Sequence, residues 1–267
     1  MIIFPNAKIN LGLNVISRRE DGYHNIETIL YPIKIQDAVE IIEADEMLFT
    51  SSGIKIPGNP EANLCLKAWY LMSEDIDLPK VHIHLHKQIP VGAGLGGGSA
   101  DGAFCIRLLN EKFDLSLTAE KMEDYSRRLG SDCAFFIKNQ PVVARGKGDE
   151  FERIDLSLES YFVVLVMPSV HVNTAEAYQS IRPKVSGSVL EDLAGLSVER
   201  WKDVLVNDFE FPVFKSHPLI SEIKDELYRK GALYASMSGS GASVYGIFKD
   251  QIRMPDLERE NFVFYGI

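Results

Sequence analysis

Cysteine is scarce in this sequence, and long apolar runs are absent. The 267 residues include three cysteines, at positions 65, 105 and 133. They are odd in number, far apart and set among apolar neighbours, which favours buried thiols in a reducing compartment over disulfides or a metal cluster. No apolar run approaches the roughly 20 residues of a membrane span. The first residues also lack the charged-then-apolar pattern of a signal peptide, so we expect a soluble cytoplasmic protein that does not contact membranes.

Clustered basic residues are also lacking. Lys and Arg number 28 against 38 Asp and Glu, so the net charge is −10. Nucleic acids are held by clustered Lys and Arg, and we therefore expect no nucleic-acid partner. A small anionic ligand needs only a local pocket and is compatible with this charge. The hydrophobic share of 46% is that of an ordinary globular protein, with a chain long enough for one large domain or two modest ones.

Periodicity predicts an α+β chain. In the first part, strands are expected over 2–17, 23–35, 38–42, 47–50 and 81–87, helices over 61–73, 99–110 and 118–129, and two strands around Gly146-Lys-Gly148. We expect the strands before residue 51 to form an antiparallel sheet. In the second part, strands are expected over 162–167, 244–248 and 262–265, and helices from Asn173 and over 198–206 and 219–230. We place the boundary so that the domains are 1–157 and 158–267.

Glycine is concentrated in Pro90-Val-Gly-Ala-Gly-Leu-Gly-Gly-Gly-Ser-Ala-Asp101, between a predicted strand and a predicted helix. Glycines let a ligand lie against bare backbone, and a helix start presents unpaired N–H groups, an arrangement that suits a phosphate. The segment formally matches the dinucleotide pattern G-x-G-x-x-G. However, histidines alternate along the preceding strand, and no acidic residue about 20 positions beyond the glycines is a convincing candidate at the end of a following strand. The Walker pattern is absent, and a glycine-rich turn without a ligand is the remaining alternative.

Several polar residues have two interpretations when taken singly. Lys8, on a predicted strand, is more often a solvated lysine than a functional one. Asp132 follows a helix-ending glycine and is more often a helix cap than a placed catalytic carboxylate. His82, His84 and His86 share one strand face; two of them could chelate zinc, but nothing completes a ligand set, so a solvated face is favoured.

Taken together, Ala7-Lys-Ile-Asn10, the glycine-rich segment and Ser238-Gly-Ser-Gly-Ala242 resemble the three motifs of the GHMP small-molecule kinases. Asp21-Gly-Tyr-His24, Leu129-Gly-Ser-Asp132 and Ala144-Arg-Gly-Lys-Gly148 resemble those members that act on 4-diphosphocytidyl-2-C-methyl-D-erythritol in the non-mevalonate pathway of isoprene biosynthesis. The resemblance covers residues 4–248. It implies an α+β, two-lobed GHMP kinase fold, with a ribosomal-protein-S5-like N-terminal lobe, a ferredoxin-like C-terminal lobe and the active site in the cleft.

The resemblance also implies a reaction and its residues. ATP would phosphorylate the 2-hydroxyl of the cytidyl diphosphate substrate, giving the 2-phosphate and ADP, with Mg²⁺ present and no residue assigned as a metal ligand. Asp132 would accept the hydroxyl proton, and Lys8 would be its catalytic neighbour. The implied ATP-binding residues are Pro90, Gly92, Gly94, Leu95, Gly96, Gly97, Gly98 and Ser99, with Asn63 and Lys87 near the adenine. The implied substrate-binding residues are Asn10, Tyr23, His24, Thr174 and Tyr178, of which Tyr23 and His24 would hold the cytosine.

Other functions stay open from the sequence. A GHMP kinase of the homoserine or mevalonate type is disfavoured by the segment 21–24, because those substrates carry no nucleobase. A non-catalytic binding module of the same fold is disfavoured by the presence of both Lys8 and Asp132. A Rossmann-type dehydrogenase is the third alternative. The motifs also depart from the family pattern at Ala100, which replaces a second serine, and at Gly102, which replaces alanine. We expect a monomer or a homodimer.

Overall fold

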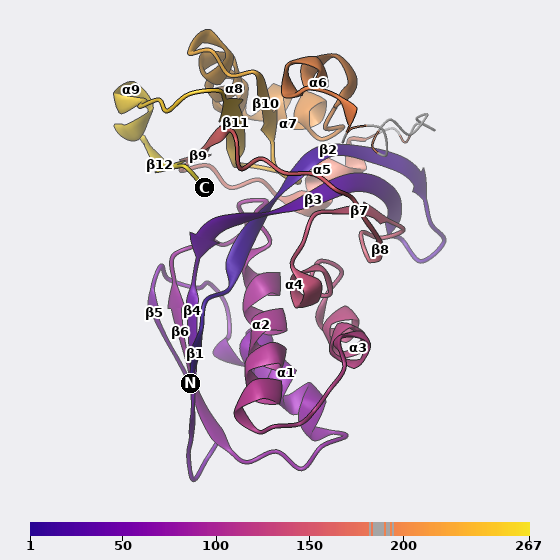
Figure 1. Ribbon diagram of the computed structural model, residues 1–267, viewed down its shortest axis with the longest axis vertical. Helices are drawn as coiled ribbons and strands as arrows, with labels where there is room; N and C mark the ends of the chain where they lie inside the picture. Colours follow the sequence, from indigo (N-terminus) through magenta and orange to yellow (C-terminus); the bar gives the residue numbers. More distant parts are fainter. Residues whose placement is uncertain (182, 184–189, 191–192, 194) are drawn as a thin grey trace. The chain divides into compact units, whose positions relative to one another are not determined.

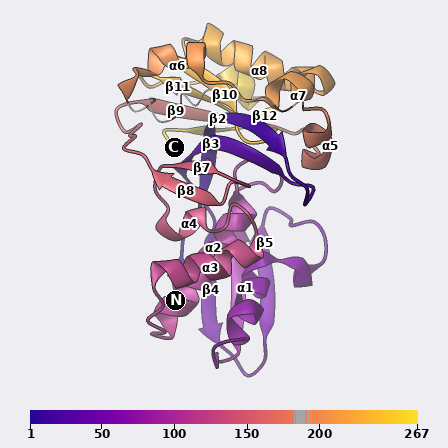
Figure 2. The same ribbon diagram turned by 90° about the vertical axis from the view of Figure 1, so that its right-hand side faces the viewer.

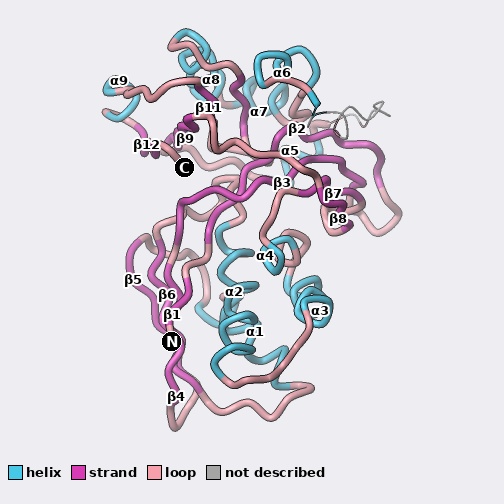
Figure 3. The backbone as a smooth tube through the Cα atoms, viewed as in Figure 1, coloured by secondary structure: helices cyan, strands magenta, loops and turns pink. Residues whose placement is uncertain are grey.

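The fold is that of a computed structural model, in which residues 1–181, 183, 190, 193 and 195–267 are described. The strands, drawn in Figures 1 and 3, are β1 (Ile2–Ile3), β2 (Asn6–Arg18), β3 (His24–Gln36), β4 (Ala38–Glu43), β5 (Leu48–Gly53), β6 (Val81–Lys87), β7 (Val142–Arg145), β8 (Glu150–Arg153), β9 (Phe162–Pro168), β10 (Tyr234–Met237), β11 (Val244–Phe248) and β12 (Asn261–Tyr265). The helices are η1 (Pro60–Ala62), α1 (Leu64–Ser73), α2 (Gly97–Lys112), α3 (Ala119–Leu129), α4 (Phe135–Lys138), α5 (Thr174–Gln179), α6 (Val198–Val204), α7 (Glu210–Ser216), α8 (Pro218–Arg229) and α9 (Pro255–Glu258).

The chain divides into two compact units. Unit 1 comprises residues 1–8, 32–91 and 96–140, and unit 2 comprises residues 9–31, 92–95 and 141–267. This division does not coincide with the predicted boundary after residue 157. The strands β2 and β3 each begin in one unit and end in the other, because each is 13 residues long and continuous.

Unit 1 is built on a sheet with the order β1-β4-β6-β5. Strand β6 shows why it forms: Val81, Ile83 and Leu85 are fully buried, while the alternating histidines are partly exposed. Helices α1 and α2 lie against the apolar face, as Figure 2 shows. The core they share with the sheet includes Cys65, Ala68 and Met72 from α1 and Cys105, Ile106 and Leu109 from α2.

The first strands do not form the single antiparallel sheet that we predicted. Strands β2 and β3 belong to a second sheet, of order β2-β3-β7-β8. Strand β5 pairs with β6 in parallel, with Leu48 opposite His82 and Gly53 opposite Lys87. A parallel pair needs a crossover, and α1 supplies it between the two strands. Local alternation indicates that a segment is a strand but carries no information on its partner, which explains the error.

A third four-stranded sheet, of order β10-β11-β9-β12, lies in unit 2 and has antiparallel pairing throughout. Its central strand β9 is almost entirely buried, as its continuous apolar run predicted. Helices α6 and α8 pack on β10, and α8 also packs on β11. The core gathers Val164, Val166 and Val244 from the sheet, Ile220, Ile223 and Leu227 from α8, and Leu13 and Val15 from β2.

Most predicted elements are confirmed within a few residues of their ends. Asn173 caps α5 as expected, since its side chain accepts hydrogen bonds from the backbone N–H groups of Ala175 and Glu176. Three short helices, α4, α7 and α9, were missed because each has seven residues or fewer, which is too short for a clear helical period. The described part of the chain contains no helix long and apolar enough to span a bilayer. All three cysteines are free and buried.

Candidate active site

Lys8 and Asp132 form an ion pair in unit 1. Lys8 Nζ lies 3.5 Å from Asp132 Oδ2, and the lysine side chain is 5% exposed against 36% for the aspartate. Asp132 does not cap the following helix, because the N-cap of α4 is Ala134, which makes no side-chain cap bond. The solvated-lysine and helix-cap interpretations are therefore both wrong. The pair places an accessible carboxylate beside a buried ammonium group.

The N-terminal turn of α2 lies next to this pair. A Cβ placed on Gly96 would come within 3.1 Å of Lys8 Cε, so the backbone at Gly96 touches the lysine stem directly. Burial raises the pKa of the Cys133 thiol to about 12, with a hydrogen bond from Ser99 working in the opposite direction. Ser99 thus adjoins the turn that carries Asp132. Unit 1 therefore brings together Lys8, Asp132, Gly96 and Ser99.

The start of α2 is suited to an anion. Its N-cap is Gly96 in the left-handed conformation, and no side chain of the described residues caps its first amides. The helix is 16 residues long, so its dipole adds a partial positive charge at this end. Gly98 is exposed, has no positive φ, and has no atom within 4 Å of where a Cβ would stand. Neither the backbone conformation nor the neighbouring atoms therefore require a glycine at this position.

The remaining predicted ATP-binding residues are less directly placed for ligand contact. The Leu95 side chain is 1% exposed. Pro90 is partly exposed. Asn63 caps α1, since its Oδ1 accepts a hydrogen bond from Cys65 N at 2.9 Å. Ala100 is fully buried, so the position where a second serine was expected faces the interior of unit 1.

Lys87 does not present its side chain to a ligand. It is 2% exposed, with Nζ bound to Asp37 and 2.7 Å from Asp101 Oδ2. Asp37 Oδ1 also accepts hydrogen bonds from the backbone of Gln88 at 2.5 Å and Ile89 at 2.8 Å. This buried triad of Asp37, Lys87 and Asp101 joins the entrance of the glycine-rich loop to the first turns of α2. The Lys87 side chain therefore has a structural role beside the loop instead of facing solvent.

In unit 2, three predicted site residues converge on the second glycine-rich loop, Ser238–Ser243. Ser238 Oγ donates to Gly94 O at 2.9 Å and accepts from Asn10 N at 3.3 Å. Thr174 Oγ1 lies 2.9 Å from Ser240 Oγ. The sequence identified this loop as a family motif but did not predict Ser238 or Ser240 as site residues. Their hydroxyl contacts depend on chain folding, so the only available signal was the motif itself.

The predicted nucleobase residues lie at the start of β3 and on α5. The His24 and Tyr178 rings stack on each other, with centroids 4.8 Å apart and planes inclined by 20°. At that separation no third ring fits between them. Tyr23 is 57% exposed, and its ring lies under Lys147 Nζ, 5.3 Å from the centroid. Partial burial, together with the charge of Arg18, lowers the pKa of His24, which keeps the imidazole neutral with one donor and one acceptor nitrogen.

The chain matches two family models. The model described as GHMP kinases N terminal domain matches residues 63–140, which contain the glycine-rich loop and Asp132. The model described as GHMP kinases C terminal matches residues 189–261, which contain the second glycine-rich loop.

Curated relatives that match nearly the whole chain include proteins named as one kinase. A protein of Bacteroides fragilis named 4-diphosphocytidyl-2-C-methyl-D-erythritol kinase is 51% identical over 264 residues, covering 97% of this chain and 96% of the relative. A protein of Cytophaga hutchinsonii with the same name is 51% identical over 262 residues, with 98% and 96% coverage. A crystal structure titled 4-(cytidine 5'-diphospho)-2C-methyl-D-erythritol kinase has a TM-score of 0.82 and 29% identity, covering all of this chain and 98% of the other.

Proposed function

The chain belongs to the 4-diphosphocytidyl-2-C-methyl-D-erythritol kinase family of GHMP kinases, and from that premise we propose that Lys8 and Asp132 carry its phosphoryl transfer. The protein is a small-molecule kinase with the α+β GHMP kinase fold. It phosphorylates the 2-hydroxyl of 4-diphosphocytidyl-2-C-methyl-D-erythritol at the expense of ATP. The single observation that supports the residue assignment is the ion pair of an accessible carboxylate with a buried lysine beside the glycine-rich loop.

Asp132 acts as the general base in this proposal. Its carboxylate accepts the proton of the substrate hydroxyl as the oxygen bonds to the γ-phosphorus of ATP, and ADP leaves with the β–γ bridging oxygen. Lys8 holds the carboxylate in a fixed orientation through the ion pair. Because the ammonium is buried and the carboxylate is partly exposed, only the carboxylate is open to a substrate from solution.

The glycine-rich loop and the first turn of α2 bind the ATP phosphates. The amides of Gly97, Gly98 and Ser99 point away from the helix body at its N-terminus, where the helix dipole also favours negative charge. We propose Mg²⁺ as the accompanying ion, which neutralises phosphate charge when bound. Ser99 and Asp132 are the residues that would supply side-chain oxygens to such an ion, which fits an ion held mainly by phosphates and water.

The cytidyl end of the substrate binds in unit 2. The neutral His24 ring offers hydrogen bonds to the edge of the cytosine, and Tyr178 stacks on the His24 ring and orients it. Tyr23 and Thr174 complete the group, and Asn10 contacts the substrate near the reacting hydroxyl. Homoserine and mevalonate lack a nucleobase, so neither would contact His24 and Tyr23 in this way.

An ADP-release assay on the purified protein tests the proposal. We expect turnover with 4-diphosphocytidyl-2-C-methyl-D-erythritol and none above background with homoserine or mevalonate. The variant Asp132→Asn should still bind ATP, while kcat falls by the roughly 10²–10⁴-fold that a general base contributes. The matched control is Asp124→Asn, which changes an exposed helical aspartate that pairs with Arg127. Near-normal turnover of Asp132→Asn would remove this residue from the catalytic role.

We also propose a cytoplasmic location, which three buried free thiols support. The net charge of −10 supports the absence of a nucleic-acid partner. We also propose that the protein is a monomer or a homodimer.

A further inference from the structure

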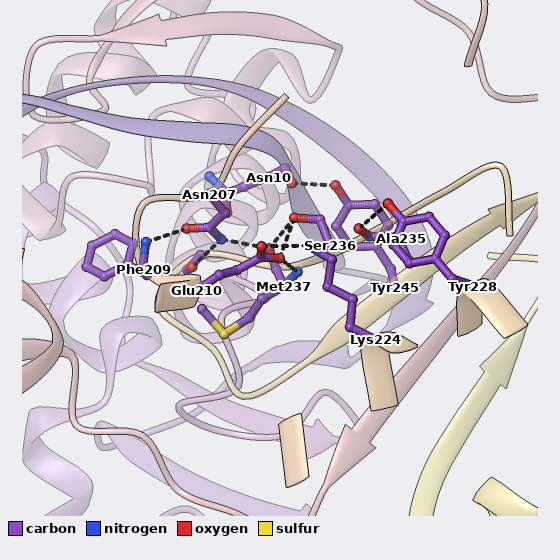
Figure 4. Close-up of polar contacts among 11 residues, drawn as sticks. Asn10, Asn207, Phe209, Glu210, Lys224, Tyr228, Ala235, Ser236, Met237 and Tyr245 are labelled. Atoms are coloured by element: carbon purple, nitrogen blue, oxygen red, sulfur yellow. Dashed lines mark hydrogen bonds and ion pairs between the residues drawn. The ribbon is translucent and has the colours of Figure 1, made fainter. Parts of the chain in front are cut away.

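A segment outside the predicted site holds the second glycine-rich loop in place. Asn207 is 2% exposed, and its side-chain amide donates to Met237 O at 2.8 Å and to Gly239 O at 2.9 Å. Its Oδ1 accepts a hydrogen bond from Phe209 N at 3.0 Å (Figure 4). Both amide hydrogens and the carbonyl oxygen are therefore used, and the amide is held in one orientation.

Glu210 holds the strand that leads into the same loop. Its Oε1 accepts hydrogen bonds from Ser236 Oγ at 3.1 Å and from Met237 N at 2.9 Å. Its Oε2 pairs with Lys224 Nζ of α8 at 2.6 Å, which fixes the carboxylate on its other side (Figure 4). Ser236 to Gly239 is thus bound from one side by two residues that are three positions apart in sequence.

The same segment is joined to the strand that carries Asn10. Leu13 N donates to Val206 O at 2.8 Å, and Asp208 N donates to Leu13 O at 2.9 Å. Asp208 Oδ2 accepts from Val15 N at 2.7 Å. The segment 206–210 therefore bridges β2 and the second glycine-rich loop.

We propose that Asn207 and Glu210 are positioning residues for both substrates of the kinase. Fixing the carbonyls on either side of Ser238 sets its hydroxyl, which in turn binds Gly94 O and Asn10 N. A loop with glycines at positive φ samples many conformations unless it is bound, so two hydrogen bonds from a rigid buried amide preorganise it. The inference rests on the proposed function, because it takes Gly94 and Asn10 as ligand-binding positions.

The test compares Asn207→Asp with Asp208→Asn. Asn207→Asp keeps the side-chain shape and the oxygen that accepts from Phe209 N. It replaces the NH₂ group, which donates to Met237 O and Gly239 O, with an oxygen that cannot donate. Asp208→Asn replaces a carboxylate by an amide at the next residue, and its Oδ1 can still accept the hydrogen bond from Val15 N. We expect kcat/KM to fall about 100-fold for ATP and for the cytidyl substrate alike in Asn207→Asp, as for small misplacements of reacting groups. Asp208→Asn should change it by about twofold at most.

Amide hydrogen exchange of the ligand-free proteins separates positioning from a general loss of stability. We expect faster exchange at residues 93–94 and 237–243 in Asn207→Asp, with the rest of unit 2 unchanged. Exchange raised throughout unit 2, or a kcat/KM equal to that of wild type, would overturn the proposal. If Asn207→Asp does not fold, Asn207→Ala, which removes the donors without adding charge, is judged by the same two criteria. If the wild-type protein failed to phosphorylate the cytidyl substrate, the proposed function would be refuted. Hydrogen exchange would then still show whether Asn207 orders the second glycine-rich loop.

Discussion

At the scale of single residues, burial determines which charges are available to a substrate. Lys8 and Asp132 have opposite charges but differ in exposure, so in the proposed mechanism the lysine positions the aspartate and the aspartate reacts with the substrate. Lys87 is a contrasting case, since both its partners are buried carboxylates and its role is to shape the loop. Residue type alone does not distinguish these two lysines.

The nucleobase assignment leads to a prediction at His24. The substitution His24→Ala removes a hydrogen-bonding ring and the stacking partner of Tyr178. We expect the KM for the cytidyl substrate to rise roughly 10-fold or more, because one hydrogen bond and one stacking contact are together worth about 1.5–4 kcal/mol. The KM for ATP should be nearly unchanged. Steady-state kinetics with each substrate varied in turn measures both.

The matched control for this prediction is His82→Ala. His82 lies on β6 in unit 1, where its Nε2 is 2.7 Å from Thr50 Oγ1. The His82→Ala variant should leave the KM for the cytidyl substrate and the KM for ATP unchanged. Equal increases in both KM values for His24→Ala would count against the cytosine assignment.

At the scale of elements, the glycine-rich loop contains glycines of two kinds. A Cβ on Gly94, whose φ is +78°, would lie 2.1 Å from Ser238 O, so the contact with the second loop requires glycine there. Gly98 is in the first turn of α2 and faces open space. The first kind is needed for the fold, and we propose that the second is needed for the ligand.

This distinction predicts opposite effects of alanine at the two positions. Gly94→Ala should destabilise the protein by about 1–3 kcal/mol, as strained and overpacked sites do. Gly98→Ala should leave stability unchanged or raise it by up to about 1 kcal/mol through helix propensity, while raising the KM for ATP. Thermal unfolding and ATP-dependent kinetics test the pair. An unchanged KM for ATP in Gly98→Ala would place the phosphates elsewhere.

At the scale of the whole molecule, the buried triad links stability to pH. Burial raises the pKa of Asp101 to about 7, in opposition to the nearby Lys87 ammonium. Two carboxylates share one lysine here, and Asp37 has the backbone hydrogen bonds, so Asp101 is the one that keeps a proton. Burial alone would lower the pKa of Lys87, but Asp101 and Asp37 outweigh it and raise that pKa.

The expected sign follows from proton binding. Between roughly pH 4 and pH 7 the folded state holds a proton on Asp101 that the unfolded state has released, so stability falls as pH rises through this window. Asp101→Asn removes the titration. The variant should gain stability relative to wild type between pH 5 and pH 8, by on the order of a few kcal/mol. Urea unfolding midpoints across that range measure the difference.

Asp37→Asn is the control for the triad. It removes the carboxylate that binds Gln88 N, Ile89 N and Lys87, so it should lower stability at every pH in the range. A pH-independent difference between Asp101→Asn and wild type would show that Asp101 is ionised throughout.

Much of the molecule follows from local sequence. Alternation along β6, the apolar run of β9, the Asn173 cap and the glycine-rich segment each specify their own structure, because side-chain periodicity and backbone freedom act over a few neighbouring residues. The order of the motifs along the chain was likewise sufficient to indicate the kinase family.

Tertiary structure decided what local patterns do not carry. Strand partners, the parallel pairing of β5, the burial of Lys8 and the triad around Lys87 each join residues far apart in the chain. The same holds for Asn207, an ordinary asparagine in the sequence that becomes a fully bonded support of a glycine-rich loop. Burial and hydrogen-bond geometry arise only when distant segments meet, and they determine which polar side chains face a substrate and which hold the others in place.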